Sequence, residues 1–367
     1  MKIIQILPEL NAGGVEGCVV EMAAYLASNG HESIVISNGG RLVADLEKAG
    51  SRHIQMPVHR KAIRSLLQIC SLRTLLAVEC PDIVHVHSRV PAWLAWLAWQ
   101  GMDPASRPRL VTTVHGFYSV NGYSSIMTRG ERVIAVSESI REYILENYSK
   151  TNSAVIRHVS HGIEQKSYHP DFRPSAEWLT RWRTQYPGLS QKHTLLLPGR
   201  ITRLKGHENL FQLIAALKHE GKAVCGLIAG DTHPKKRAYL RELHQRTREL
   251  GISDDIIFLG HRGDLREIMA VCDIVLALSQ QPESFGLTVL EALALGKPVV
   301  GYDCGGVGEL LAALFPVGKV PCGDKARLVQ VINAVLAAHP QPLAVGEPFT
   351  LNAMCRSTLD VYRELAG

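Results

Sequence analysis

The chain has 367 residues, of which 46% are hydrophobic, and it carries a formal net charge of +6 at pH 7. This length exceeds what one hydrophobic core comfortably supports and suits two domains of roughly 150 to 200 residues each. The mean hydropathy is near zero, and the apolar runs fall well short of the roughly 20 residues that a membrane-spanning helix needs. The composition therefore predicts two domains with substantial cores and no membrane span.

The modest basic bias, with a pI near 8.9, is compatible with nucleic acid, an anionic membrane surface or phosphorylated small molecules as partners. The opening MKIIQILPELNAGG lacks the longer apolar region and cleavage site of a secretory signal, so we expect a cytoplasmic protein. The basic stretch HRKAIR, from His59 to Arg64, fits either an amphipathic helix on the inner face of the cytoplasmic membrane or an ordinary helix with a solvated face.

Eight cysteines occur without a CxxC pair, and most of them lie within apolar segments. Reduced, buried thiols are the favoured interpretation of this pattern. No His/Cys cluster has the spacing of a zinc site, and no Asp-x-Asp triplet follows a predicted strand. We therefore expect neither a metal nor a resident cofactor.

Strands and helices alternate from the first residue. In the first half, a helix is predicted over residues 14–28, and apolar strands are predicted at 2–7, 33–37, 83–87 and 110–115. From about residue 165 to 191 the pattern breaks into a stretch of prolines, aromatics and charges without a clear strand, which we interpret as the passage between domains. The alternation then resumes, with helices after Gly206, over 237–250 and after Gly286, and with strands at 194–197, 224–229, 256–259, 274–278 and 298–302.

This rhythm predicts an α/β fold with two doubly wound, mostly parallel sheets that helices cover on both faces. We place the N-terminal domain at residues 1–165 and the C-terminal domain at 166–345. Residues 346–367 include a helical pattern over 351–365. Ligands of such sheets bind beyond the carboxyl ends of the strands, so motifs that follow strands have the first claim on function.

Two loops that follow predicted strands suit phosphate. In PELNAGGVE, Gly13 and Gly14 would let backbone amides approach a phosphate at the start of a helix, and a structural turn is the alternative. In PGRITRLKGHENL, Arg200 and Lys205 flank a turn that ends at Gly206. The arginine fork and the lysine point charge could neutralise a diphosphate, and solvated loop cations are the alternative.

The segment QPESFGLTVLEALALGKPVV places Glu283 and Glu291 eight positions apart. In continuous helix the two would lie about 12 Å apart along the axis, whereas the two acids of a glycosidase lie roughly 5 to 9.5 Å apart. If Glu283 lies in a loop and Glu291 on the first helical turns, they bracket a helix N-terminus. The free amides there, at Gly286, Leu287 and Thr288, could hold phosphate, and ordinary surface charges are the alternative.

In combination, GGVE, GRITRLKG, IAGD, FLGHR and the E-x7-E element followed by ALGKPVV occur in one order. Over nearly the whole chain this resembles family 4 of the retaining glycosyltransferases, whose GT-B architecture has two Rossmann-like domains facing a central cleft. The segments HSRVPAWLAWLAW, TVHGFYSVNGYSSIMTRGERVIAVSESI and HGIE look most like a subgroup that builds the lipopolysaccharide core. In that family the last helix crosses back onto the N-terminal domain, so we expect the same of residues 346–367.

The resemblance implies roles for the donor-side residues. Arg200 and Lys205 would hold the donor diphosphate, aided by backbone amides at 13–14 and 286–288. Glu291 would bind the ribose hydroxyls of the nucleotide, and Glu283 those of the transferred sugar.

Two further positions acquire a role from the same resemblance. The segment of Gly260, His261 and Arg262 would line the base pocket, mostly through its main chain. His115, at the end of the strand in TVHG, would face the donor sugar and the acceptor, and a structural hydrogen-bonding histidine is the alternative.

The implied reaction transfers a hexosyl group, with retention and without a metal, from a nucleotide sugar to a hydroxyl of a saccharide or lipid-linked acceptor. UDP is the expected nucleotide, and synthesis of the lipopolysaccharide core or another cell-surface polysaccharide is the expected setting. A sugar-nucleotide epimerase or hydrolase of the same fold, and a non-catalytic nucleotide- or membrane-surface-binding protein, remain alternatives. We expect no nucleic acid as a partner, because the basic residues are dispersed and no recognised module is present.

Overall fold

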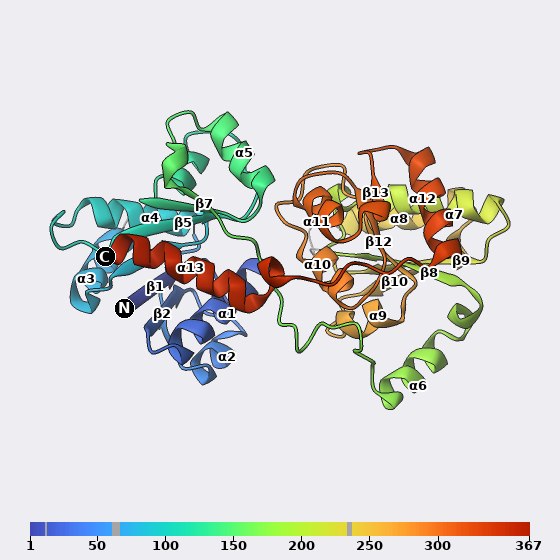
Figure 1. Ribbon diagram of the computed structural model, residues 1–367, viewed down its shortest axis with the longest axis horizontal. Coiled ribbons are helices and arrows are strands. Elements are labelled where there is room, and N and C mark those ends of the chain that lie inside the picture. Colours follow the sequence, from blue (N-terminus) through green and yellow to red (C-terminus); the bar gives the residue numbers. More distant parts are fainter. Residues whose placement is uncertain (12, 61–66, 233–236) are drawn as a thin grey trace. The chain divides into compact units, whose positions relative to one another are not determined.

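The computed structural model describes residues 1–367 except 12, 61–66 and 233–236. The chain forms two compact units, Met1–Gly162 with Pro348–Gly367 as unit 1 and Ile163–Glu347 as unit 2 (Figure 1). The sequence places the corresponding boundaries after residues 165 and 345. Most of the basic stretch from His59 to Arg64 lies outside the described residues, so the helix considered for it stays a prediction.

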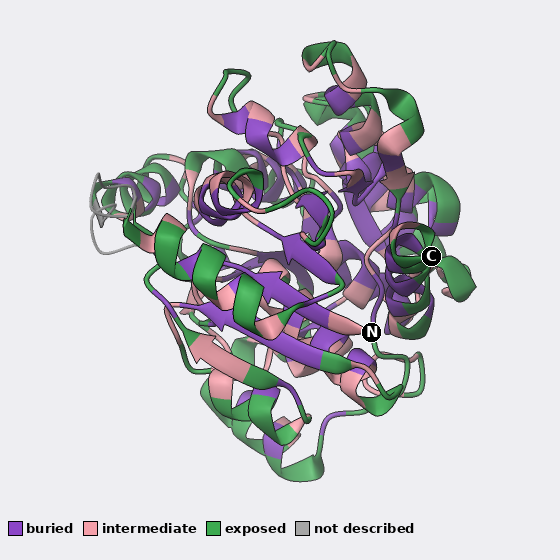
Figure 2. Ribbon diagram, turned by 90° about the vertical axis from the view of Figure 1, so that its left-hand side faces the viewer, coloured by how far each residue is buried: buried purple, intermediate pink, exposed green. Residues whose placement is uncertain are grey.

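Unit 1 contains a seven-stranded parallel sheet in the order β3-β2-β1-β4-β5-β6-β7. Its strands are β1 (Lys2–Ile6), β2 (Glu32–Ser37), β3 (Arg52–Gln55), β4 (Ile83–Val86), β5 (Arg109–Val114), β6 (Arg132–Ala135) and β7 (Ile156–His158). The central strands are apolar and buried, whereas the edge strand β3, with the sequence RHIQ, is partly exposed (Figure 2). The strand order reverses between β1 and β4, which is where doubly wound sheets bind their ligands.

The helices of unit 1 are α1 (Gly14–Ser28), α2 (Val43–Lys48), α3 (Leu67–Glu79), α4 (Arg89–Gln100), α5 (Glu138–Asn147) and α13 (Leu351–Ala366). Side-chain caps fix the starts of two of them. The hydroxyl of Ser137 accepts a hydrogen bond from the N–H of Ile140 at the start of α5, and Thr350 does the same for Ala353 at the start of α13. Such caps satisfy backbone donors that a helix start leaves without partners.

The last helix belongs to the core of unit 1. From α13, Met354, Leu359 and Tyr362 join Ile3 and Ile83 of the central strands in one buried cluster. The helix lies beside α1 in the left-hand part of Figure 1. The helix predicted over 351–365 therefore crosses back onto the unit that the first 162 residues form.

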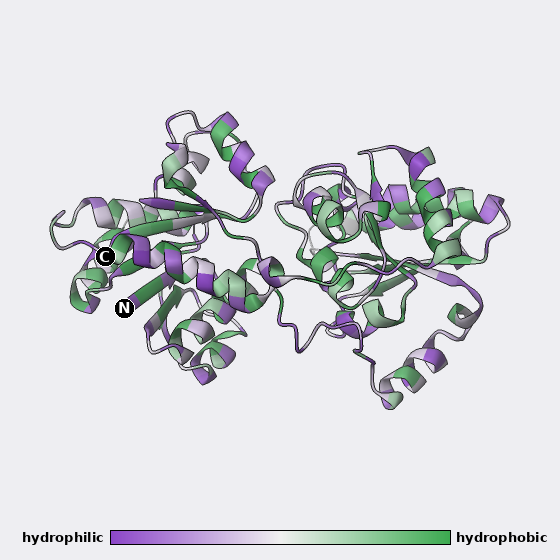
Figure 3. Ribbon diagram, in the orientation of Figure 1, coloured by the Kyte–Doolittle hydropathy of each residue, from purple (hydrophilic) through white to green (hydrophobic). Residues whose placement is uncertain are grey.

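Unit 2 contains a six-stranded parallel sheet in the order β10-β9-β8-β11-β12-β13. Its strands are β8 (His193–Pro198), β9 (Val224–Ala229), β10 (Ile256–Gly260), β11 (Ile274–Ala277), β12 (Val299–Tyr302) and β13 (Lys319–Val320). Figure 3 shows hydrophobic strands in this sheet, which matches their burial between two layers of helices. The order reverses between β8 and β11, so the chain leaves these two strands toward opposite faces of the sheet and the two loops flank the expected binding edge.

The helices of unit 2 are α6 (Ala176–Gln185), α7 (His207–His219), α8 (Arg237–Glu249), α9 (Leu265–Val271), α10 (Leu287–Ala294), α11 (Gly306–Leu314) and α12 (Lys325–Ala338). Helix α6 lies inside the stretch that the sequence assigns to the passage between domains. It forms because Ser175 caps its start and because Trp178 and Trp182, four residues apart, stack with ring centroids 5.2 Å apart. The passage is therefore partly regular structure that packs within unit 2.

We expect Tyr362→Phe to destabilise unit 1. The Tyr362 hydroxyl lies 2.7 Å from Nδ1 of His85, and both side chains are buried. Removing the hydroxyl leaves a buried imidazole nitrogen without its partner, which costs about 1 to 3 kcal/mol. Urea denaturation followed by circular dichroism measures the loss, and the control is Asp360→Ala on the exposed side of the same helix. Equal unfolding midpoints for the two variants would contradict the expectation.

Candidate functional site

The loop after β8 carries the two predicted cations to the point of strand reversal in unit 2. Arg200 is exposed and makes no ion pair with any residue that the structure describes. Lys205 closes a short 3₁₀ helix (Arg203–Lys205), and its Nζ lies 2.8 Å from Oε1 of Glu283. The two side chains of this pair are 29% and 23% exposed, so the pair stays open to solvent. The structure thus joins Lys205 and Glu283, which the sequence treats as parts of separate motifs.

Close backbone contacts hold the surrounding loops together. A Cβ atom at Gly206, where φ is +76°, would lie 2.0 Å from the carbonyl oxygen of Leu278, just beyond β11. A Cβ at Gly230 would lie 1.9 Å from the carbonyl oxygen of Gly199, and the N–H of Gly230 donates to the carbonyl of Gly260 at 2.9 Å. No side chain fits at either glycine, so the loops after β8, β9, β10 and β11 meet by backbone contact.

Glu283 lies in a loop, and a free helix start follows it. The N–H of Gly306 donates to the carbonyl oxygen of Glu283 at 2.8 Å, which anchors the loop to the chain beyond β12. Helix α10 begins directly after Gly286, which adopts φ +94°. Within the described chain, the N–H groups of Leu287 and Thr288 make no hydrogen bond. These amides and the positive end of the helix dipole favour an anion at this place.

Glu291 lies on α10, as the sequence predicts, but it has a partner that the sequence did not reveal. Burial and then the negative charge of Glu291 raise the pKa of Tyr168, so the Tyr168 hydroxyl and the Glu291 carboxylate are neighbours. Arg266 donates to the carbonyl oxygen of Ser167 at 3.3 Å and lies over the ring of Phe172, which holds the tyrosine segment against unit 2. Nothing in the spacing of HGIEQKSY marks this tyrosine.

The predicted base-pocket segment presents its backbone rather than its arginine. Arg262 makes a forked ion pair with Asp264, at 2.8 and 2.6 Å, and lies over the ring of Trp182. The space beside Gly260 is open, and His261 is exposed. The guanidinium is therefore committed to holding α6 and α9 together, which leaves the main chain and His261 for a ligand.

In unit 1, the two predicted glycines lie where expected, between β1 and α1. Helix α1 begins at Gly14, and the N–H of Gly17 donates to the carbonyl oxygen of Gly13. A Cβ at Gly13 would lie within 2.4 Å of the Glu16 carboxylate. The start of this helix thus already has one negative group beside its amides.

Four histidines gather in unit 1: His85 lies within β4, and His87, His115 and His161 follow β4, β5 and β7. His87 Nδ1 lies 3.1 Å from His115 Nε2, and the His115 ring stacks on His161 with centroids 5.5 Å apart. His85 Nδ1 and Nε2 lie 2.7 Å from the Tyr362 hydroxyl and 2.6 Å from the Thr113 hydroxyl. His115, the predicted site histidine, is therefore part of a connected cluster.

Hydrogen-bond partners assign the protons of two of these rings. Gln5 donates through Nε2 to the carbonyl oxygen of Val19, so its Oε1 faces His87 and accepts from Nε2–H at 3.2 Å. His87 Nδ1 is then an acceptor, and His115 Nε2–H donates to it. This leaves a lone pair on His115 Nδ1, a buried atom without a hydrogen-bond partner in the described part of the chain. Such an atom calls for an outside donor, a water or a ligand hydroxyl.

The four rings are neutral at physiological pH. Burial lowers the pKa of His85 to about 3 and that of His161 to about 4. Burial and the neighbouring rings hold the pKa values of His87 and His115 well below the ordinary range. His115 can therefore accept a hydrogen bond through its lone pair without first losing a proton.

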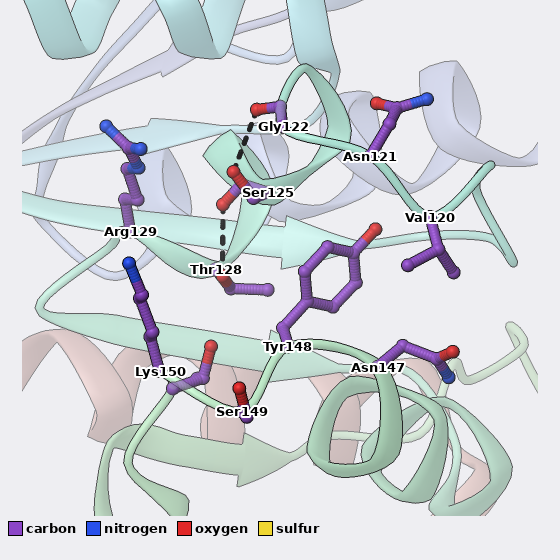
Figure 4. Close-up of a pocket in the computed structure, with 11 residues that line it drawn as sticks. Val120, Asn121, Gly122, Ser125, Thr128, Arg129, Asn147, Tyr148, Ser149 and Lys150 are labelled. Carbon is purple, nitrogen blue, oxygen red and sulfur yellow. Dashed lines mark hydrogen bonds between the residues drawn. The ribbon is translucent and has the colours of Figure 1, made fainter.

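A second feature of unit 1 is an open pocket of about 330 Å³ between the loop over residues 120–129 and the residues after α5 (Figure 4). Asn121, Ser125, Tyr148 and two cations, Arg129 and Lys150, contribute to its lining. Neither cation makes an ion pair with a described residue. Figure 4 shows Lys150 extending toward Arg129. The pocket offers hydroxyl, amide and positive groups to a polar ligand.

The cysteines depart in part from the expectation of buried thiols. All eight are free, and three of them, Cys70, Cys80 and Cys322, are exposed. In the described ranges, no group of three or more His, Cys, Asp or Glu side chains is placed to hold a metal ion. No helix there combines the length and the apolar character that crossing a membrane requires.

Two family models match this chain. The model of Glycosyltransferase Family 4 matches residues 12–167, and the model of Glycosyl transferases group 1 matches residues 180–347. Together the two matches span most of the chain and include the motifs from GGVE, which begins at Gly13, to ALGKPVV.

Individual proteins resemble the chain along most of its length. N-acetyl-alpha-D-glucosaminyl L-malate synthase of Bacillus anthracis is 28% identical over 329 residues, 84% of this chain and 80% of the relative. Lipopolysaccharide core biosynthesis mannosyltransferase LpsB of Rhizobium meliloti is 28% identical over 318 residues, 80% of this chain and 86% of the relative. The structure of Anabaena Alr3699/HepE in complex with UDP and glucose aligns with a TM-score of 0.77 at 22% identity, covering 100% of this chain and 98% of that one. This likeness confirms the predicted fold of two Rossmann-like domains.

We expect acidification to destabilise the protein through the histidine cluster. The folded-state pKa values lie below the ordinary value of 6.5, so at mildly acid pH the unfolded chain binds more protons than the folded chain. Above about pH 6.5 the free energy of unfolding has its full value with respect to these histidines. As the pH falls below this, the free energy of unfolding decreases by up to about 1.4 kcal/mol per pH unit for each histidine. Urea unfolding between about pH 7 and about pH 5 measures the slope.

The variant His161→Phe should reduce this slope, because it removes one proton-binding group and keeps an aromatic ring beside His115. The control His219→Asn changes an exposed histidine in unit 2. A slope in His161→Phe as steep as that of the unaltered protein would contradict the role of the cluster.

Proposed function

Because the chain belongs to the family 4 glycosyltransferases, we propose that it transfers a hexosyl group from a UDP-sugar to a hydroxyl of a saccharide or lipid-linked acceptor. The observation that carries the proposal is the contact between Lys205 and Glu283 at the strand reversal of unit 2, with Arg200 in the same loop as Lys205 and with the start of α10 four residues after Glu283. These groups provide two cations and a helix start for a diphosphate, with a carboxylate beside them for sugar hydroxyls.

The chemistry requires a nucleoside diphosphate to leave with its negative charge. Arg200 has no ionic partner in the described structure, so its forked donors remain available to the phosphates. Lys205 bonds Glu283, and its other two donors can reach an incoming phosphate without breaking that bond. Cations and amide dipoles aimed at the diphosphate stabilise the charge that grows as the sugar–phosphate bond breaks. We propose that they do this without a metal and with retention at the anomeric carbon.

The two glutamates take different parts of the donor in this proposal. Tyr168 lies beside the Glu291 carboxylate and helps to orient it toward the ribose hydroxyls, which a carboxylate can bind as an acceptor. Glu283 is held by Lys205 and by its backbone bond to Gly306. Its carboxylate accepts hydrogen bonds from hydroxyls of the transferred sugar. The backbone at 260–261 lines the nucleobase.

For the acceptor, unit 1 supplies the proposed groups. His115 offers a neutral ring with one lone pair that the described chain does not use. The pocket beside Arg129 and Lys150 suits a polar or anionic saccharide. Synthesis of the lipopolysaccharide core is the proposed setting, because the relative LpsB acts there by its name and three segments of the chain resemble that subgroup. UDP is the proposed nucleotide because the related Anabaena protein binds it.

We expect UDP and UDP-sugars, but not GDP or ADP, to raise the melting temperature in the presence of a metal chelator. A ligand that binds only the folded state stabilises it by about 2.7 kcal/mol at one hundred times its dissociation constant. Arg200→Ala should lose at least about tenfold in UDP affinity, since it removes a charged hydrogen bond worth about 1.5 to 3 kcal/mol.

The matched control is Arg203→Ala in the same loop, because Arg203 is bound by Glu208 and Glu242 instead. Equal UDP affinity for the two variants would remove the diphosphate role of Arg200. Absence of any nucleotide effect would overturn the donor site. Turnover of a UDP-sugar with no acceptor present would indicate an epimerase or hydrolase.

Tyr168→Phe should weaken UDP binding and leave pyrophosphate binding unchanged. The variant removes one neutral donor from Glu291, at a cost of about 0.5 to 1.5 kcal/mol, and it touches no group assigned to the phosphates. Isothermal titration with both ligands separates the two effects. An equal loss for pyrophosphate would show that the tyrosine supports the loop in general and not the carboxylate.

A further inference from the structure

The loops after β12 and β13 bring two cysteine thiols together. Tyr302 and Val320 are paired in the parallel ladder, and Cys304 and Cys322 each lie two residues beyond that pair. The N–H of Asp303 donates to the carbonyl oxygen of Val320 at 2.7 Å, which continues the ladder past the strand ends. Neighbouring strands lie about 4.8 Å apart, within the Cα separation of about 4.4 to 6.8 Å that a disulfide spans. After burial, the neighbouring Cys322 thiol contributes to the raised pKa of Cys304, as expected for two sulfur atoms on adjacent segments.

The two thiols differ in access. Cys322 is exposed, and its Sγ lies 3.6 Å from the carbonyl oxygen of Gln280. Cys304 is half-buried, and burial, with a further contribution from Cys322, raises its pKa to about 11. A reagent from solvent therefore meets Cys322 first, and Cys304 lies behind it as a second thiol.

The pair adjoins the loop that carries Glu283. Cys304 is followed by Gly305, where a Cβ would lie 2.5 Å from the carbonyl oxygen of Glu283, and by Gly306, whose N–H donates to that oxygen. Cys322 contacts Gln280 at the other end of the same loop. A bond between the two thiols would thus join two segments that hold the loop over residues 280–283.

We propose that Cys304 and Cys322 form a reversible disulfide and are a site of oxidative modification beside the donor loop. The Cys322 thiolate attacks a low-molecular-weight disulfide such as glutathione disulfide, which forms a mixed disulfide and releases one glutathione thiolate. The Cys304 thiolate then attacks the Cys322 sulfur and expels the second glutathione. The protein loses two protons and two electrons, and glutathione disulfide takes them up to become two glutathione thiols.

The test uses the full chain with Cys70→Ser and Cys80→Ser, which remove the other exposed thiols. After treatment with glutathione disulfide, the denatured protein is alkylated, digested and analysed by mass spectrometry. We expect a linked pair of peptides containing Cys304 and Cys322 that dithiothreitol separates. In the Cys304→Ser variant, Cys322 should instead retain glutathione, because the second thiol is absent.

A stable glutathione adduct on Cys322 with Cys304 still present, or free alkylation of both thiols, would overturn the proposal. Cys304→Ala is measured in parallel, and both variants are checked by circular dichroism, so that a folding defect of one substitution is recognised. None of these readouts needs a nucleotide, so they do not depend on the proposed function.

The effect of the disulfide on donor binding by the loop over residues 280–283 rests on the proposed function, and it is measured separately. We expect UDP-sugar affinity to differ between the oxidised and reduced protein by about fivefold or more, the lower end of typical coupling between two sites. Dithiothreitol should reverse the change, and Cys304→Ser should not show it. Cross-linking without a change in affinity would overturn the coupling, and UDP-sugar binding by neither form would instead count against the donor site itself.

Discussion

Both units depend on the reversal of strand order beside their first strand. In a parallel sheet the helices that follow neighbouring strands pack on opposite faces at such a point, so the two loops there diverge and leave backbone groups open. In unit 2 this opening lies between β8 and β11. The absence of a side chain at Gly206 and Gly230 allows the surrounding loops to approach each other closely. Lys205, which directly precedes Gly206, bonds Glu283 from the loop that follows β11.

At the strand reversal, unit 2 presents charged side chains whereas unit 1 presents neutral ones. In unit 2, the groups at the reversal are charged and partly open to water, so their interactions weaken with salt and can be exchanged for those of a ligand. In unit 1, the groups are histidines held neutral by burial, and their order comes from directional hydrogen bonds that begin at Gln5. One place is suited to binding an anion and the other to positioning a hydroxyl.

The sequence predicts most strands because a buried parallel strand is a short continuous apolar run, whatever surrounds it. The strands it does not predict, β3, β6, β7 and β13, are short or lie toward sheet edges, where polar residues interrupt the run. The donor-side motifs follow strands and are therefore visible one by one. Tyr168 and Gln5 are not visible, because each meets its partner, Glu291 or His87, only through tertiary packing.

The position of α13 bears on how the chain folds during its own synthesis. Domains generally fold in the order in which they leave the ribosome. Unit 1, however, includes α13, which follows unit 2 in the chain, and the Tyr362 hydroxyl of this helix bonds the buried His85. Unit 2 is one continuous segment of the chain, so all of its residues are synthesised before α13 completes unit 1. Unit 1 therefore completes its core only after α13 has been synthesised, and until then the apolar surface that α13 covers stays exposed.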